Sequence, residues 1–196
     1  MNRYPAIALI EFGSVVAGTT AADAMVKTAP IEMVHAGTIH RGKYLVLVGG
    51  SVAAVDRSFE EGLRIGTENV LDKVFLPDVH AEVHDAVFGE RRNDAYDALG
   101  IIESEVVAPV VQAADAGVKG ARAHVKDIRL GDGLGGKGIV WFTGAIADVQ
   151  AAVEIGCRAV GDRTTRLCTT VIPALHEDMI QQVGESTRFH RPARSG

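Results

Sequence analysis

The chain has 196 residues, and its 20 lysines and arginines against 25 aspartates and glutamates give a formal net charge of −5. Hydrophobic residues make up 47% and aromatic residues 5%, which is typical of a folded globular protein and excludes a disordered chain. The acidic balance and the few aromatic rings argue against a nucleic-acid binder, which presents a basic face with rings that stack on bases.

Membrane and secreted classes are also not expected. No apolar run reaches the roughly 18 residues that span a bilayer, and the first eleven residues lack the apolar core of a signal peptide. The two cysteines, Cys157 and Cys168, give no disulfide framework and no zinc motif. We therefore expect a cytoplasmic protein with no membrane partner and no nucleic-acid partner.

One pattern of residues occurs twice along the chain. Ala-Ala-Asp-Ala-Met-Val-Lys at 21–27 returns 92 residues later at 113–119 with a single change. Two further blocks agree in the same order, at offsets of 94 and 96 residues: 50–55 with 144–149, and Pro77 and His80 with Pro173 and His176. Each increase in offset marks a two-residue insertion, and insertions fall in loops. The sequence thus predicts two copies of one domain, 1–92 and 93–196, with a polar linker at 89–94 and a polar tail at 184–196.

In chain order, each copy has the pattern strand, helix, hairpin, helix, strand. The first copy predicts a strand at 6–12, a helix capped by Thr19 or Thr20 and ending at Thr28, strands at 31–39 and 43–49, a helix capped by Ser51, a strand at 70–76, and a short helix after Pro77. The second predicts strands at 98–104, 123–130, 137–143 and 166–172, and helices at 109–119 and 145–160. The fold class is α/β, with a mainly antiparallel sheet and flanking helices in each copy.

A glycine-rich segment at 131–137 matches two phosphate-binding patterns on paper. Both patterns require a following helix whose N–H groups hold the phosphate. The apolar run Ile139 to Thr143 follows instead, and it has the character of a strand. We therefore interpret the segment as a hairpin loop.

No group of residues marks a catalytic centre, so we expect no enzymatic activity. His80 and His84 have the i,i+4 spacing of a metal pair, but solvated or capping histidines are the favoured interpretation because no acid is fixed nearby. Cys157 and Cys168 are expected to be buried apolar thiols. Glu11 and Glu103 end equivalent first strands, where they serve as buried paired carboxylates or as structural anchors.

These motifs together resemble the bacterial microcompartment shell domain (BMC domain). The resemblance is carried by Ala-Ala-Asp-Ala-Met-Val-Lys after an Ile-Glu strand, the glycine-ended hairpin, the Gly-x-Val/Ile-x-x-Val helix and the Pro-x-x-His element. It covers the chain twice, from about Ala6 to Ile180, in the order of the non-permuted tandem (BMC-T) members. The resemblance implies a homotrimer that forms a pseudohexamer, a structural tile in the cytoplasmic shell, bordered by hexameric and other shell proteins.

The resemblance also implies roles for individual residues. The family's pore passes small metabolites, and the residues matching its lining lie in the two hairpin loops: Thr38, Ile39, His40, Arg41, Gly42, Leu130, Gly131, Asp132, Gly133, Leu134, Gly135 and Gly136. The residues matching tile-edge contacts are Lys27, Lys119, His80 and His176. Where the family often has an Arg before the Pro-His segment, Asp78 and Ala174 stand, so edge packing is expected to differ.

Some tandem relatives hold an iron–sulfur cluster through a cysteine in the first pore loop. His40 occupies that position, and such a cluster requires thiolate ligands, so no cofactor is expected. His40 could line the pore without further chemistry, favour anionic metabolites together with Arg41, or bind a metal. Two alternatives to the tile are a trimeric small-molecule sensor and an enzyme with a site between the domains.

Overall fold

The computed structural model describes residues 3–92, 97–161 and 166–185, with sixteen elements. The first domain consists of β1 (Ala6–Phe12), α1 (Val15–Thr28), β2 (Met33–Ile39), η1 (His40–Gly42), β3 (Lys43–Gly50), α2 (Val52–Gly66), η2 (Thr67–Asn69), β4 (Val70–Leu76) and α3 (Ala81–Val87). The second consists of β5 (Ala98–Ser104), α4 (Ala108–Gly120), β6 (His124–Leu130), β7 (Gly138–Gly144), α5 (Ile146–Val160), β8 (Leu167–Ile172) and α6 (Glu177–Glu185).

Each domain contains a four-stranded antiparallel sheet, in the orders β2-β3-β1-β4 and β6-β7-β5-β8. The central strand pairs β1–β3 and β5–β7 share one register, since Glu11 is opposite Leu45 in the first and Glu103 is opposite Ile139 in the second. The expected fold class and the internal repeat are therefore confirmed. The shared register places one two-residue insertion in the loop between β6 and β7 and the other between α5 and β8.

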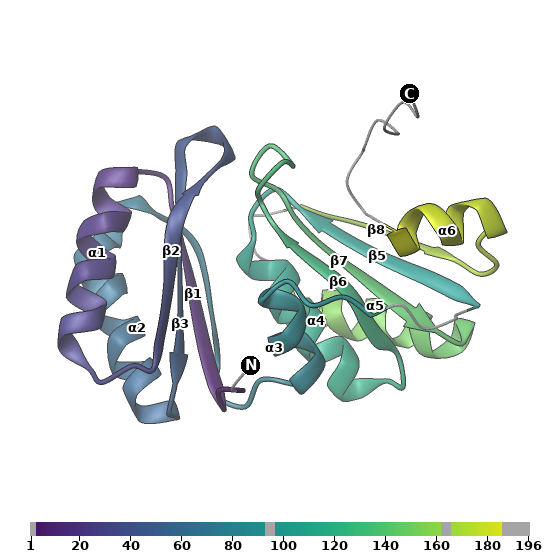
Figure 1. The fold of residues 1–196 in the computed structure, drawn as a ribbon, viewed down its shortest axis with the longest axis horizontal. Helices are drawn as coiled ribbons and strands as arrows, with labels where there is room; N and C mark the ends of the chain where they lie inside the picture. Colours follow the sequence, from purple (N-terminus) through teal and green to yellow (C-terminus); the bar gives the residue numbers. More distant parts are fainter. Residues whose placement is uncertain (1–2, 93–96, 162–165, 186–196) are drawn as a thin grey trace, which may run out of the picture.

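The layers alternate across the molecule (Figure 1). α1 and α2 cover one face of the first sheet, and α4 and α5 cover one face of the second, while α3 and α4 lie at the junction between the two domains. α4 therefore packs on β7 of its own domain and also on β4 of the first domain. One helix of the second domain thus packs on the face of the first sheet that α1 and α2 leave open.

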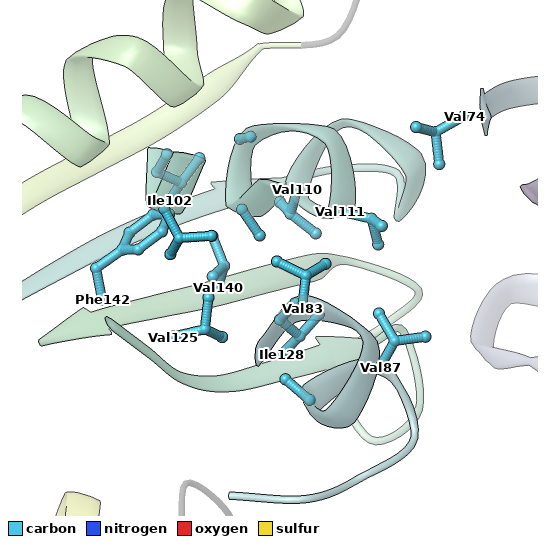
Figure 2. Close-up of a cluster of buried hydrophobic side chains, with 14 of the residues drawn as sticks. Val74, Val83, Val87, Ile102, Val110, Val111, Val125, Ile128, Val140 and Phe142 are labelled. Atoms are coloured by element: carbon cyan, nitrogen blue, oxygen red, sulfur yellow. The ribbon is translucent and has the colours of Figure 1, made fainter. Parts of the chain in front are cut away.

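The largest apolar cluster crosses this boundary (Figure 2). Val74 of β4 and Val83 of α3 belong to the first domain, and Val110 and Val111 of α4 and Phe142 of β7 to the second; all are buried. Each fully buried side chain of this size contributes about 1.5–3 kcal/mol relative to an exposed one. The two domains therefore pack together through an apolar interface as well as through the covalent connection.

The start of α1 differs from the expectation. Ser14, and not Thr19 or Thr20, caps the helix, and its hydroxyl accepts from the Ala17 amide at 3.3 Å. The hydroxyls of Thr19 and Thr20 instead donate to the carbonyls of Val15 and Val16, four residues earlier, at 2.8 and 2.9 Å. A threonine inside a helix can satisfy its hydroxyl in this way, so threonines alone do not locate a helix start.

Other element boundaries differ from the expected ones by one or two residues. For example, β2 begins at Met33 and not at residue 31, and α4 begins at Ala108 and not at residue 109. The expected linker at 89–94 continues into residues that the structure does not describe, and most of the expected tail at 184–196 also lies outside the described residues. The expected division into domains at 1–92 and 93–196 therefore stays a prediction.

Candidate functional site at the two hairpin loops

The two predicted loops are tight connections between neighbouring strands. The first, η1, turns through Arg41 at φ 67° and Gly42 at φ 69°, both in the left-handed region. The second contains four glycines with positive φ, at 131, 133, 135 and 136, and leads directly into β7. The glycine-rich segment is therefore a hairpin loop, as expected, and not a phosphate-binding turn before a helix.

The two loops touch, although 93 residues separate their contacting atoms in the chain. The Gly133 amide donates to Nδ1 of His40 at 3.0 Å, and the Asp132 carboxylate lies 3.4 Å from the same nitrogen. An accepting Nδ1 places the ring proton of neutral His40 on Nε2. The first loop of one domain thus packs against the second loop of the other, with the His40 side chain 52% exposed.

A buried ion pair anchors the base of the loops. The Lys43 ammonium lies 2.7 Å from Oε1 of Glu11, a carboxylate with no exposed surface. The Lys43 Nζ also donates to the carbonyl oxygens of Glu105 at 2.9 Å and Gly136 at 3.1 Å. Since Val107 donates its amide to Glu11 at 2.6 Å, both members of the pair bind the second domain.

Burial raises the pKa of Glu11, and the hydrogen bonds from Lys43 and Val107 offset part of that rise. A carboxylate with no exposed surface is costly unless a cation and hydrogen-bond donors surround it. The Glu11–Lys43 pair therefore fixes how the two domains sit relative to each other. The expectation for Glu11 as a buried paired carboxylate agrees with this geometry.

The equivalent pair in the second domain is open to solvent. Lys137 lies 2.6 Å from Glu103, but the two side chains are 37% and 33% exposed. The Glu103 carboxylate raises the pKa of Lys137 by its hydrogen bond and its charge. Glu105 lies close by, 3.3 Å from the Arg41 guanidinium.

The four expected tile-edge residues lie in two different settings. The Lys27 side chain is 71% exposed and pairs with Asp23 at 2.5 Å, while His176 is 75% exposed. Lys119 instead lies at the domain junction, where it pairs with Asp115 at 2.6 Å and donates to the Asp78 carbonyl. His80 caps α3 and donates its amide to Asp115 at 2.8 Å.

Sequence reasoning missed a cleft of about 720 Å³ between the domains. It is lined by four expected loop residues, namely Thr38, Ile39, Leu130 and Asp132, and also by two arginines, Arg91 and Arg129. Its walls come from β2, β3, the end of α3 and β6. No sequence signal could identify the arginines, because the cleft exists only once the two domains are placed against each other.

The remaining titratable candidates have structural surroundings. His84 is buried, not solvated: its Nε2 accepts from the Tyr4 amide at 3.2 Å. Cys157 is half-buried, and burial raises the pKa of its thiol. Cys168 is exposed, so the expectation of a buried thiol is wrong for this residue, because β8 is an edge strand of its sheet.

Across residues 3–92, 97–161 and 166–185, no group of three or more metal-binding side chains occurs, and no helix is long and apolar enough to cross a membrane.

Two similar domains in one chain, each with the same sheet, the same helices and a hairpin loop at the same end, define a tandem α/β protein. The BMC domain family matches this chain twice, at residues 6–79 and 98–175. The chain belongs to the BMC-domain family.

Known proteins agree with this assignment over nearly the whole chain. The bacterial microcompartment shell protein PduT of Citrobacter freundii is 33% identical over 92% of this chain and 98% of its own length. The carboxysome assembly protein CcmO of Synechocystis sp. is 28% identical over 89% of this chain and 63% of its own.

Solved structures extend the comparison. A microcompartment protein from Desulfitobacterium hafniense superimposes with a TM-score of 0.78 at 36% identity, covering 90% of this chain and 98% of that one. A fused permuted hexameric shell protein, at 19% identity and a TM-score of 0.57 over 79% of this chain and 83% of its own, shares the fold. The similarity to shell proteins supports a structural role in a microcompartment shell and disfavours the sensor and enzyme alternatives.

Proposed function

We propose that this chain is a trimeric tile of a microcompartment shell, with no catalytic activity of its own. Three copies would close a ring of six BMC domains, so the ring resembles a hexamer although it has threefold symmetry. The contact between the loops at 38–42 and 130–136 carries this proposal. It places the hairpin loops of two neighbouring domains side by side at one end of the molecule, where six such loops would surround a central pore (Figure 1).

The pore would pass small metabolites, and its rim carries charged side chains of both signs. Arg41, with a 63% exposed side chain, pairs with Glu105, and Asp132 lies beside the ring of His40. A cation whose charge is matched by a neighbouring carboxylate exerts little net attraction on a passing anion. The geometry favours a pore lining of mixed polarity over strong anion selectivity.

The pore loops do not fit an iron–sulfur cluster. Such a cluster requires thiolates, whereas the first loop presents His40, whose Nδ1 already accepts from the Gly133 amide. Cys157 lies in α5 and Cys168 in β8, so neither cysteine is a residue of the two loops. We therefore propose a tile without a cluster, located in the shell and bordered by hexameric and other shell proteins.

The variant His40→Cys tests the pore position of the first loop. In the trimer, the three introduced thiols would converge on the axis, so a short thiol-reactive crosslinker should join chains into dimers and trimers on a denaturing gel. Cys168→Ser in the same chain removes the exposed native thiol, and wild type carrying only Cys168→Ser is the control. Absence of crosslinked chains from a protein that elutes as a trimer would place the first loop away from the axis.

A further inference from the structure

The cleft of about 720 Å³ between the domains has the size of a small-molecule site. Such sites typically have volumes of about 300–1,000 Å³ and occur preferentially where two domains meet. The walls of the cleft are β2 and β3 of the first domain, the end of α3, and β6 of the second domain. All of these elements belong to one chain, so the cleft does not depend on the proposed trimer.

Apolar side chains from both domains line this cleft. Four of them are more than nine-tenths buried: Leu45 and Leu47 of β3, Val87 of α3, and Ile128 of β6. Phe88, the residue that follows α3, adds an aromatic ring to the same lining. A lining of this kind favours a ligand with a hydrocarbon chain or ring, because binding removes apolar surface from water.

Gly37 leaves open space on the β2 wall of the cleft. It is directly opposite Leu45, so a side chain at either position lies on the same face of the sheet. A Cβ atom added at Gly37 would meet no other atom within 4 Å. The residue that holds the equivalent position in β6, opposite Ile139, is Arg129. The first copy of the repeat thus has a glycine where the second has a long cationic side chain.

Arg129 supplies a cation to the β6 wall of the cleft. It is only 9% exposed, and its Nη2 donates to the backbone carbonyl of Asp132 at 3.1 Å. A guanidinium has five N–H groups, so it can donate to a ligand while it keeps this bond. The two carboxylates of the lining have cationic or imidazole neighbours, because Asp127 pairs with Arg91 at 2.8 Å and Asp132 lies beside His40. Arg129 is therefore the residue of this lining best suited to hold an anionic group.

From the apolar lining, the open space at Gly37 and the buried guanidinium, we propose that the cleft binds a small amphipathic carboxylate. The hydrocarbon part of the ligand lies against Leu45 and Leu47, and its carboxylate accepts hydrogen bonds from Arg129. A carboxylate matches a guanidinium because it can accept two parallel N–H bonds. This inference goes beyond the proposed tile, since neither the ring of six domains nor passage through its pore requires a ligand between the domains.

Octanoate, octan-1-ol and octylamine test the proposed ligand class, because they share one hydrocarbon chain and differ in the head group. Isothermal titration calorimetry of the full chain at neutral pH measures their binding. We expect octanoate to bind once per chain, with a Kd at least about tenfold lower than that of the alcohol or the amine. Equal binding of all three would contradict the role of Arg129, and absence of octanoate binding at millimolar concentration would overturn the site.

Gly37→Leu locates the probe, and Ala36→Leu is its matched control. The leucine at 37 would fill the cleft and should weaken octanoate binding by about tenfold or more. Ala36 is exposed, does not line the cleft, and points to the other face of β2, so Ala36→Leu should bind octanoate as wild type does. Octanoate binding that persists in Gly37→Leu would overturn the site.

Arg129→Met tests the head-group contact separately. It should weaken octanoate binding by about tenfold and leave the binding of octan-1-ol unchanged, because the alcohol does not need the charge. Circular dichroism should show that the variants are folded. If Arg129→Met does not fold, Gly37→Leu still decides whether octanoate binds in the cleft. Unchanged octanoate binding in folded Arg129→Met would contradict the assigned contact.

Discussion

Lys43→Ala is expected to lower the free energy of unfolding by about 3–5 kcal/mol at neutral pH, since it leaves the fully buried Glu11 carboxylate without its cation. The loss includes the two hydrogen bonds that Lys43 donates across the domain junction. Urea denaturation followed by circular dichroism, at a fixed protein concentration, measures the change. A loss below about 1 kcal/mol, the range of an exposed pair, would contradict the anchoring role of the pair.

The effect of Lys43→Ala should depend on pH in a defined direction. Burial raises the pKa of Glu11, so the folded chain binds a proton at a higher pH than the unfolded chain does. Without Lys43 that rise becomes larger. The variant should therefore be least stable relative to wild type at neutral pH, and the difference should shrink as the pH falls and Glu11 becomes protonated.

Lys137→Ala is the matched comparison for Lys43→Ala. The two lysines hold equivalent positions, but only Lys43 is covered within its own chain. Lys43→Ala should destabilise the protein strongly, whereas Lys137→Ala, which removes one partner of a solvent-exposed ion pair, should leave the stability close to that of wild type.

Lys27→Ala is expected to abolish the ordered sheets that a shell tile forms on overexpression while leaving the trimer intact. Lys27 is 71% exposed, and its ion pair with Asp23 is of a kind that contributes little to stability, so its removal should not disturb the fold. Negative-stain electron microscopy of cells and of purified protein measures sheet formation. Lys119→Ala should have the same effect on sheets, but it should also lower stability, because Lys119 pairs with the buried Asp115 at the domain junction.

Arg64→Ala is the control for the edge lysines. Arg64 is 67% exposed and pairs with Glu61 three residues earlier, so it matches Lys27 in exposure and in type of contact. Sheets should persist in this variant. If sheets also persist in Lys27→Ala and Lys119→Ala, these lysines do not make the contact between tiles.

The sequence was sufficient to predict the fold because the repeat and the apolar pattern agree. The repeat makes the strand of Glu11 equivalent to that of Glu103, and the two residues share one register in their sheets. The start of α1 could not be predicted from Thr19 and Thr20, because their hydroxyls bond within the helix. The exposure of Cys168 could not be predicted either, because burial of an edge strand depends on what packs beside the sheet.

The site was predictable only in part. Both loops could be located from their glycines and from the family resemblance, but their contact through His40 and Gly133 joins residues that are 93 positions apart. The bonds from Lys43 to Glu105 and Gly136 likewise depend on how the domains are placed. The local sequence pattern carries no information on how the two domains are placed against each other.

Native mass spectrometry of protein purified without oxygen tests the central proposal most directly. Three chains of 20.7 kDa predict an assembly of about 62 kDa, with no added mass from a metal or cluster. A trimer carrying extra mass would make His40 a metal ligand and contradict the tile without a cofactor. A monomer at all concentrations would contradict the ring of six domains and the pore that it encloses.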